Sequence, residues 1–114
     1  MREDIGKKVD LAFLSAFYGG LLTEKQRRIL SLHCDEDLSL AEIADEMGTS
    51  RQSVHENLSR AASRLAEFES ALGMAGRFRR MEEGLRGALG ALRADDQKKA
   101  EQILEELISL DQEE

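Results

Sequence analysis

The sequence predicts an all-α fold. Apolar residues recur at steps of three and four through most of the chain, which is the spacing of one face of a helix. No stretch shows the strict alternation of apolar and polar residues that a half-buried strand needs. Apolar residues make up 41% of the chain, charged residues 34% and aromatic residues 4%, and there is no proline. This composition favours amphipathic helices over a β sandwich.

Length and composition also limit the class of protein. A chain of 114 residues can bury one modest core. No apolar run approaches the roughly 18 residues that a membrane-spanning helix needs. No apolar segment of the signal-peptide type follows Met1, so we expect a cytoplasmic protein. Cys34 is the single cysteine and is predicted to be a small buried hydrophobe.

Two helices are expected before the acidic loop at residues 35–37. The first, over residues 3–18, ends at Gly19 and Gly20 and is expected to close the core, because it holds three of the chain's five aromatic residues. Its apolar stripe consists of Ile5, Val9, Ala12, Phe13, Ala16 and Phe17, with Tyr18 beside it. Thr23 and Gln26 have the spacing of a capping box, so a second helix begins there. Its inward residues are Ile29, Leu30 and Leu32.

The middle of the chain is predicted to form two helices joined by a tight turn. Ser39 and Glu42 form a second capping box before the first of them. Its apolar face consists of Leu40, Ile43, Ala44 and Met47. Gly48 follows, where a positive φ ends a helix without strain. Either Thr49 or Ser50 caps the next helix.

That next helix is expected to continue to Leu72, because its apolar seam repeats at alternate steps of four and three as far as Gly73. The seam consists of Val54, Leu58, Ala61, Leu65, Phe68 and Leu72. A seam of this length can serve either the core or a second subunit.

Two further helices are expected after Gly73. The first has an apolar stripe of Phe78, Met81, Leu85 and Leu89. It also contains Gly84, Gly87 and Gly90, so it is either weak alone or packs closely on another helix through its bare face. Asp95 or Asp96 caps the last helix. Its wide apolar face consists of Ala100, Ile103, Leu104, Leu107, Ile108 and Leu110.

Two segments resemble the fourth region of bacterial sigma factors, a helix-turn-helix. They are residues 22–30, LTEKQRRIL, and residues 38–44, LSLAEIA, followed by the second helix of the motif. Residues 50–60, SRQSVHENLSR, together with Tyr18, are similar to the YlxM family of small all-helical proteins. The resemblance covers most of residues 5–72. Genes of that family lie beside those of the signal recognition particle GTPases, so the resemblance implies a role in that pathway.

The second helix of the motif carries the candidate DNA-binding residues. A recognition helix places its N-terminal residues against base edges in the major groove. Arg51 and Gln52 are suitable readers because they make bidentate contacts to guanine and adenine, whereas Arg60 and Arg64 are placed for phosphates. The full candidate set is Arg51, Gln52, Ser53, His55, Ser59, Arg60 and Arg64. Flanking phosphates are also within reach of the cations of the preceding helix, Lys25, Arg27 and Arg28.

The charge of the chain argues against DNA binding. The net charge is -7, and residues 21–72 carry six positive and ten negative side chains. Phosphate contacts supply most non-specific DNA affinity and need a basic face. Asp45, Glu46 and Glu56 would each repel phosphate. The opposing hypothesis is that the helix-turn-helix is a scaffold whose outer face is solvated or binds protein.

Two functions therefore remain open. We favour a DNA-binding regulatory protein that takes part in the signal recognition particle pathway, with DNA or the particle's RNA as its ligand. The alternative is a protein-interaction module that binds the particle or its GTPases through acidic and C-terminal helical surfaces. His33 and Cys34 are adjacent on a helix and diverge by about 100°, and no phosphate-binding glycine loop is present. We predict no enzyme activity, no cofactor and no metal site.

The expected organisation has two parts. Residues 1–72 form the N-terminal helix and the helix-turn-helix, and residues 73–114 form a helical extension. The extension packs either on the same domain or on a dimer partner. The long seam and the wide face of the last helix favour a homodimer.

Overall fold

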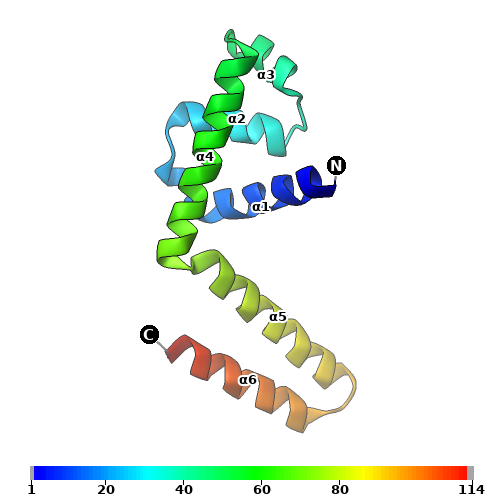
Figure 1. The fold of residues 1–114 in the computed structure, drawn as a ribbon. Coiled ribbons are helices and arrows are strands. Elements are labelled where there is room, and N and C mark those ends of the chain that lie inside the picture. Colours follow the sequence, from blue (N-terminus) through cyan, green and yellow to red (C-terminus); the bar gives the residue numbers. More distant parts are fainter. Residues whose placement is uncertain (1, 113–114) are drawn as a thin grey trace. The chain divides into compact units, whose positions relative to one another are not determined.

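The computed structural model describes residues 2–112, with side chains described for residues 10–110. Every regular element in that range is helical, so the predicted all-α fold is confirmed. The helices are α1 (Arg2–Tyr18), α2 (Glu24–Cys34), α3 (Leu40–Met47), α4 (Arg51–Leu72), α5 (Met74–Arg93) and α6 (Gln97–Gln112), with a short 3-10 turn, η1 (Gly19–Leu21), after α1 (Figure 1). The predictions for Ile5 and Val9 concern side chains outside the described range.

The chain forms two compact units. The N-terminal unit is Met1–Ala75 and the C-terminal unit is Gly76–Glu114. The predicted domain boundary at residue 72 remains a prediction. So does the packing of the C-terminal extension on the same domain or on a dimer partner. Among the helices described, none is both long enough and apolar enough to cross a membrane.

Local signals in the sequence determine where the helices begin and end. The Thr23 hydroxyl accepts from the Gln26 N–H at 3.1 Å, and the Gln26 side chain accepts from the Thr23 N–H at 3.2 Å. Ser39 and Glu42 make the same reciprocal pair at the start of α3. Gly48 and Gly73 have φ of 66° and 63° and end α3 and α4. Both predicted capping boxes and both glycine stops are confirmed.

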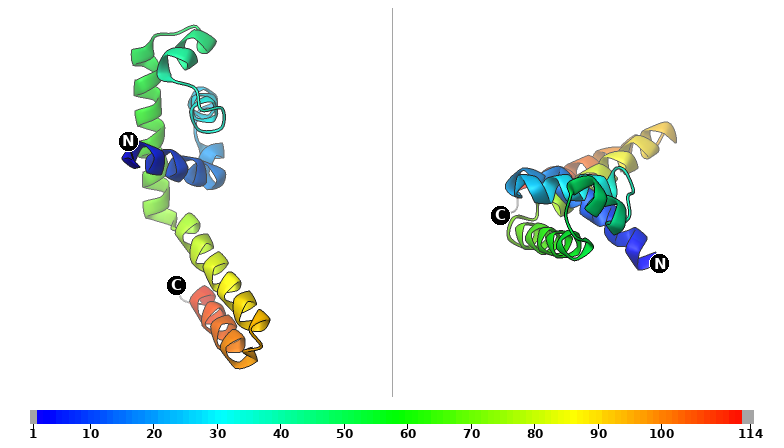
Figure 2. Two further views of the ribbon diagram at one scale, coloured as in Figure 1. Left: turned by 90° about the vertical axis from the view of Figure 1, so that its right-hand side faces the viewer. Right: turned by 90° about the horizontal axis from the view of Figure 1, so that it is seen from above.

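The N-terminal unit has two adjoining core clusters along α4, which packs against α1, α2 and α3 (Figure 2). Ile29, Ile43 and Val54 join α2, α3 and α4 in one cluster. Tyr18, Leu30 and Leu65 join α1, α2 and α4 in the other. These are fully buried side chains, and burying each one stabilises the fold by about 1.5–3 kcal/mol.

Most of the α4 seam packs in this core. Val54, Ala61 and Leu65 are completely buried. Leu72, the last residue of the predicted seam, is 56% exposed and lies outside this core. Gly73 ends the helix directly after it, and the core at that end is filled by Tyr18 and Ala75 instead.

Tyr18 and Glu69 hold the junction between α4 and α5 through three hydrogen bonds, which we call the junction clamp. Its hydroxyl donates to Glu69 Oε1 at 2.5 Å and accepts from the Met74 N–H at 3.0 Å. Glu69 Oε1 also accepts from the Ala75 N–H at 3.0 Å. Two N–H groups at the start of α5 thus find partners. Burial of the phenol and its bond to Glu69 raise the pKa of Tyr18.

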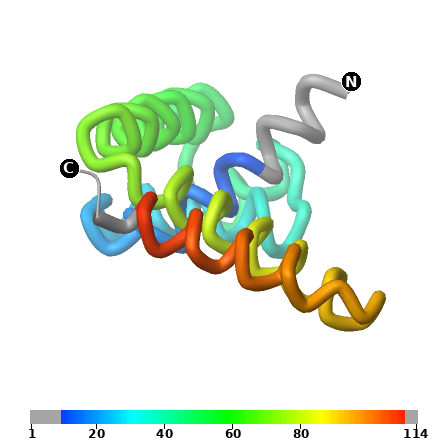
Figure 3. The backbone as a smooth tube through the Cα atoms, turned by 90° about the horizontal axis from the view of Figure 1, so that it is seen from below, coloured from blue at the N-terminus to red at the C-terminus, as the bar shows by residue number. Residues whose placement is uncertain are grey.

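The C-terminal unit is an antiparallel hairpin of α5 and α6 (Figure 3). The Asp96 carboxylate accepts from the Lys99 N–H at 3.0 Å, so Asp96 caps α6, and Asp95 occupies the turn with φ of 60°. A Cβ added at Gly84 would lie 2.8 Å from Leu107 Cγ. Of the two alternatives for the glycines, close packing on another helix is therefore the one observed at Gly84.

Three large side chains of the predicted apolar stripe of α5 are exposed. Leu85 is 50% exposed, and Phe78 and Leu89 are similarly exposed. Within the part of the hairpin whose side chains are described, the buried residues are Ala88, Ala91, Ala100 and Leu107. Small side chains let the two helices approach closely, which leaves the large ones of α5 outside.

Candidate nucleic-acid interface

The turn between α3 and α4 presents the start of α4 to solvent. Gly48 donates back to the Ala44 and Asp45 carbonyls, which closes α3. The Ser50 hydroxyl accepts from the Ser53 N–H at 3.0 Å, so Ser50 rather than Thr49 caps α4. Val54 is completely buried against α2 and α3. This anchor fixes the direction in which the neighbouring side chains of α4 point.

Six of the seven candidate DNA-binding residues are exposed. They are Arg51, Gln52, His55, Ser59, Arg60 and Arg64. Ser53 is half-buried, and its carbonyl accepts from the Asn57 side chain at 2.9 Å. The Arg64 guanidinium lies 5.2 Å from the centre of the Phe68 ring, a cation–π distance that orients this side chain.

A shallow groove lies further along α4. It has a volume of about 330 Å³ and is lined by Gln26 of α2 and by Ser59, Arg60, Ser63 and Arg64 of α4. Guanidinium and hydroxyl donors of this kind bind phosphate oxygens. Sequence reasoning missed Gln26 and Ser63. Ser63 has a helical signal, because it lies four residues after Ser59 on the same face, whereas Gln26 comes from another helix.

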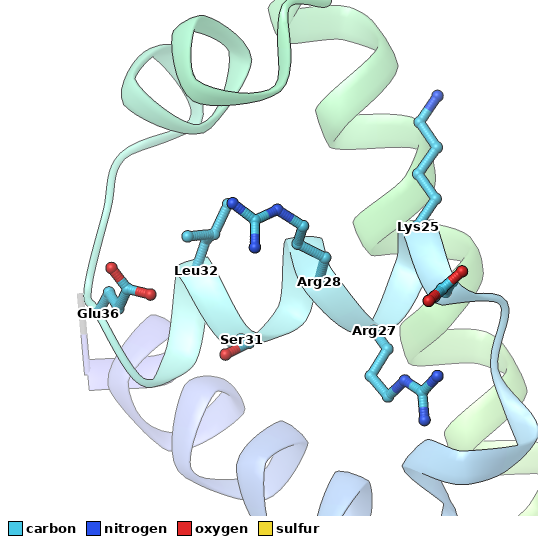
Figure 4. Close-up of a pocket in the computed structure, with 7 residues that line it drawn as sticks. Lys25, Arg27, Arg28, Ser31, Leu32 and Glu36 are labelled. Atoms are coloured by element: carbon cyan, nitrogen blue, oxygen red, sulfur yellow. The ribbon is translucent and has the colours of Figure 1, made fainter.

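The cations of α2 are divided between two sides of that helix. Lys25 and Arg28 point to the side on which α3 lies, and Arg27 points to the opposite side (Figure 4). All three line an open pocket with a volume of about 520 Å³, together with Glu24, Ser31, Leu32 and Glu36. Arg28 forms an exposed ion pair with Glu46 of α3 at 3.7 Å. Lys25 and Arg28 therefore share a side with α3, whereas Arg27 does not.

The exposed charges of this unit are segregated. Residues 49–64 contain three arginines and one glutamate, although the whole chain has a net charge of -7. Acidic residues gather instead in the loop at residues 35–37 and on α3. The first turns of α2 and α3 contain Glu24 and Glu42, whereas the first turn of α4 has no acidic side chain. The positive end of the α4 dipole is therefore left available to an anion.

Comparison with known proteins identifies the family. The family model described as "Putative helix-turn-helix protein, YlxM / p13 like" matches residues 5–107, which includes most of both C-terminal helices. UPF0122 protein BH2485 of Halalkalibacterium halodurans is 38% identical over 107 residues, covering 94% of this chain and 96% of that protein. UPF0122 protein STH1464 of Symbiobacterium thermophilum is 42% identical over 100 residues, covering 75% and 94%.

A further relative agrees with this assignment. A UPF0122 protein of Clostridium botulinum is 40% identical over 86 residues, covering 75% of this chain and 79% of its own length. The family model and these relatives match the same helical chain whose turn, caps and buried anchor form the helix-turn-helix. The resemblance to the YlxM family is confirmed, and the chain belongs to the UPF0122 family of YlxM- and p13-like helix-turn-helix proteins.

Proposed function

We propose that this chain is a regulatory protein that binds DNA by inserting the first turns of α4 into the major groove. The observation that supports this most strongly is the start of α4. Arg51, Gln52 and His55 are exposed around the buried Val54, and the first turn of the helix contains no acidic side chain. Bases and phosphates would thus meet donors before they meet Glu56.

Affinity for the DNA backbone comes from the groove on α4 in this proposal. Arg60 and Arg64 contact phosphates beside the reading residues, with Ser59 and Ser63 as neutral donors. Asp45 and Glu46 lower this affinity, although the ion pair with Arg28 partly compensates Glu46. Modest backbone affinity with stronger base readout is therefore the expected balance.

The family resemblance adds a context to this activity. We infer that the protein takes part in the signal recognition particle pathway in the cytoplasm, where DNA or the particle's RNA is its nucleic-acid ligand. A second candidate function, a protein-interaction module, is favoured by the acidic loop at residues 35–37 and the exposed acidic residues of α3. In that function the acidic surface binds a basic region of the particle or of its GTPases, without DNA binding.

One titration separates these functions. The purified protein is presented at several salt concentrations to selected DNA fragments, to signal recognition particle RNA and to the particle's GTPase. If the chain binds DNA through α4, its binding should be selective for sequence and should weaken as the salt concentration is raised. Saturable binding to the GTPase without DNA binding would favour the interaction module instead.

The double variant Arg51→Ala with Gln52→Ala tests the reading residues. Each bidentate base contact discriminates by about 1–3 kcal/mol, so selectivity for the preferred sequence should fall at least about tenfold. Helical content should not change, because both side chains are exposed. A matched control replaces Lys98 and Gln102, an exposed cation and amide of α6, by alanine. Unchanged selectivity in the α4 variant would show that this helix is not the reader.

Arg60→Ala provides a second arm of the same experiment. Loss of one phosphate contact should weaken binding evenly across DNA sequences and reduce the salt slope by about one. A change in sequence preference with this variant would place Arg60 among the base readers.

A further inference from the structure

The C-terminal hairpin exposes a patch of large apolar side chains. On α5 the patch contains Leu85 at 50%, Leu89 at 46% and Leu92 at 51% exposure. On α6 it contains Leu104 and Ile108, of which Ile108 is 60% exposed. The two helices pack on each other through other residues, which are Gly84, Ala88, Ala91, Ala100 and Leu107. We call Leu85, Leu89, Leu92, Leu104 and Ile108 the hairpin patch.

The two helices contribute to one continuous surface. Successive residues of a helix turn by about 100°, so Leu85 and Leu89 lie roughly 110° around α5 from its face toward α6. By the same count, Leu104 and Ile108 lie roughly 85° around α6 from its face toward α5. Both rotations have the same sense along their chains. Because α5 and α6 are antiparallel, both stripes lie on the same side of the hairpin.

Charges of opposite sign flank the hairpin patch on its two outer edges. Arg79, Arg86 and Arg93 recur every seven residues along α5, on the side away from α6. Glu101 and Glu105 follow the outer edge of α6 together with Lys98, so this edge has a net negative charge. One exposed ion pair, Arg86 with Glu82 at 3.5 Å, lies within the basic row. The surface is thus an apolar strip between a basic and an acidic edge.

We propose that the hairpin patch binds the hairpin patch of a second copy of this chain. A contiguous exposed apolar surface with a charged rim marks an interaction site. A twofold axis parallel to the helices places α5 of one copy on α6 of the other, so that each arginine row faces the partner's glutamates. An axis across the helices would place α5 on α5 and bring the arginine rows together. The charge pattern therefore selects both the occupant and its orientation.

Sedimentation of the full chain at about 1–100 µM tests the association. The wild-type protein should sediment as a dimer at the upper end of this range. Leu85→Glu with Leu89→Glu should raise the dissociation constant at least about tenfold, because two charges would be buried in the interface. Leu21→Glu is the matched control, because Leu21 is 55% exposed in η1 of the other unit. Circular dichroism of each variant verifies that its helices remain intact.

Charge reversal tests the orientation. Arg86→Glu with Arg93→Glu should weaken the dimer, and adding Glu101→Arg with Glu105→Arg to the same chain should restore it. Reversal of all four charges restores opposite charges across the interface only when α5 faces α6 of the partner. When α5 faces α5 of the partner, it places glutamates opposite glutamates. A monomer at every concentration would overturn the proposal and indicate that another surface covers the patch. Dimerisation that is insensitive to the Leu85 and Leu89 changes would overturn it as well.

Discussion

At the scale of single residues, Tyr18 combines a buried aromatic ring with a hydrogen-bonded hydroxyl. Its ring lies in the core beside Phe17 and Phe68, and its hydroxyl is the centre of the junction clamp. A phenol with 1% exposure needs such partners, because an unsatisfied buried polar group is costly. One side chain of α1 thereby links Glu69 near the end of α4 to the first residue of α5.

Tyr18→Phe keeps the ring and removes the hydroxyl. Glu69 then loses a donor and the Met74 N–H loses its acceptor, so the Tm should fall by about 5 °C or more. Thermal unfolding followed by circular dichroism measures the change. Phe17→Leu is a useful comparison, because it alters the aromatic packing without touching the clamp. An unchanged Tm in the Tyr18 variant would show that the clamp does not stabilise the fold.

The pH dependence of stability should also depend on Tyr18. Its pKa is raised above the usual 10.0 by burial and by the bond to Glu69, so the folded state holds the phenolic proton more tightly than the unfolded state. This stabilisation is complete below pH 10 and is lost as pH rises through the folded-state pKa. Denaturant unfolding at pH 8–11 should show this loss in the wild type, and Tyr18→Phe should lack that part of it. Parallel curves for both proteins would contradict the assignment.

At the scale of the elements, the sequence predicted where helices begin and end, whereas it left open which face of α5 packs on another helix. The caps at Thr23 and Ser39 and the stops at Gly48 and Gly73 are local signals, readable within three or four residues. The inward face of α5 depends on which side meets α6, so the sequence left open whether the glycine face packs on another helix. The junction clamp joins residues 51 positions apart, so no local pattern could reveal it.

Replacing two glycines of α5 by alanine should change the stability of the hairpin in opposite directions. Gly84→Ala should destabilise the hairpin, because the new methyl group would lie 2.8 Å from Leu107 Cγ and force that buried side chain to move. Gly90→Ala meets nothing within 4 Å and should stabilise α5 by about 0.8–1 kcal/mol through helix propensity. Chemical denaturation of both variants measures the two signs. Equal effects would show that Leu107 is not held against Gly84.

At the scale of the whole molecule, the two units differ in the size of the side chains that they bury. The N-terminal unit buries Ile29, Ile43, Val54 and Leu65 completely. Among the side chains described in the C-terminal unit, the buried ones are those of three alanines and Leu107. An isolated hairpin of about 40 residues is near the lower limit for folding alone. The helix-turn-helix could be predicted from the sequence because its core comes from residues 18–65. The candidate contact residues then followed from their positions on the second helix of the motif.

Fragments of the chain test this difference. Residues 1–75 should unfold cooperatively, and residues 76–114 should show little helix at low concentration. The fragment ending at residue 72 is the matched control, because it lacks the buried Ala75 and the Met74 N–H. It should be less stable than residues 1–75 when both are followed by circular dichroism. Equal stability would place the boundary at residue 72.

The junction clamp has a consequence for hydrogen exchange. The first amides of a helix normally exchange quickly, because they have no partner in the preceding turn. At the start of α5, the Met74 amide donates to Tyr18, which lies in the core of the N-terminal unit, and the Ala75 amide donates to Glu69, which is bonded to Tyr18. Their protection is therefore governed by the opening of that core and not by fraying of α5. Two amides at a helix start thus report the integrity of the domain that precedes them.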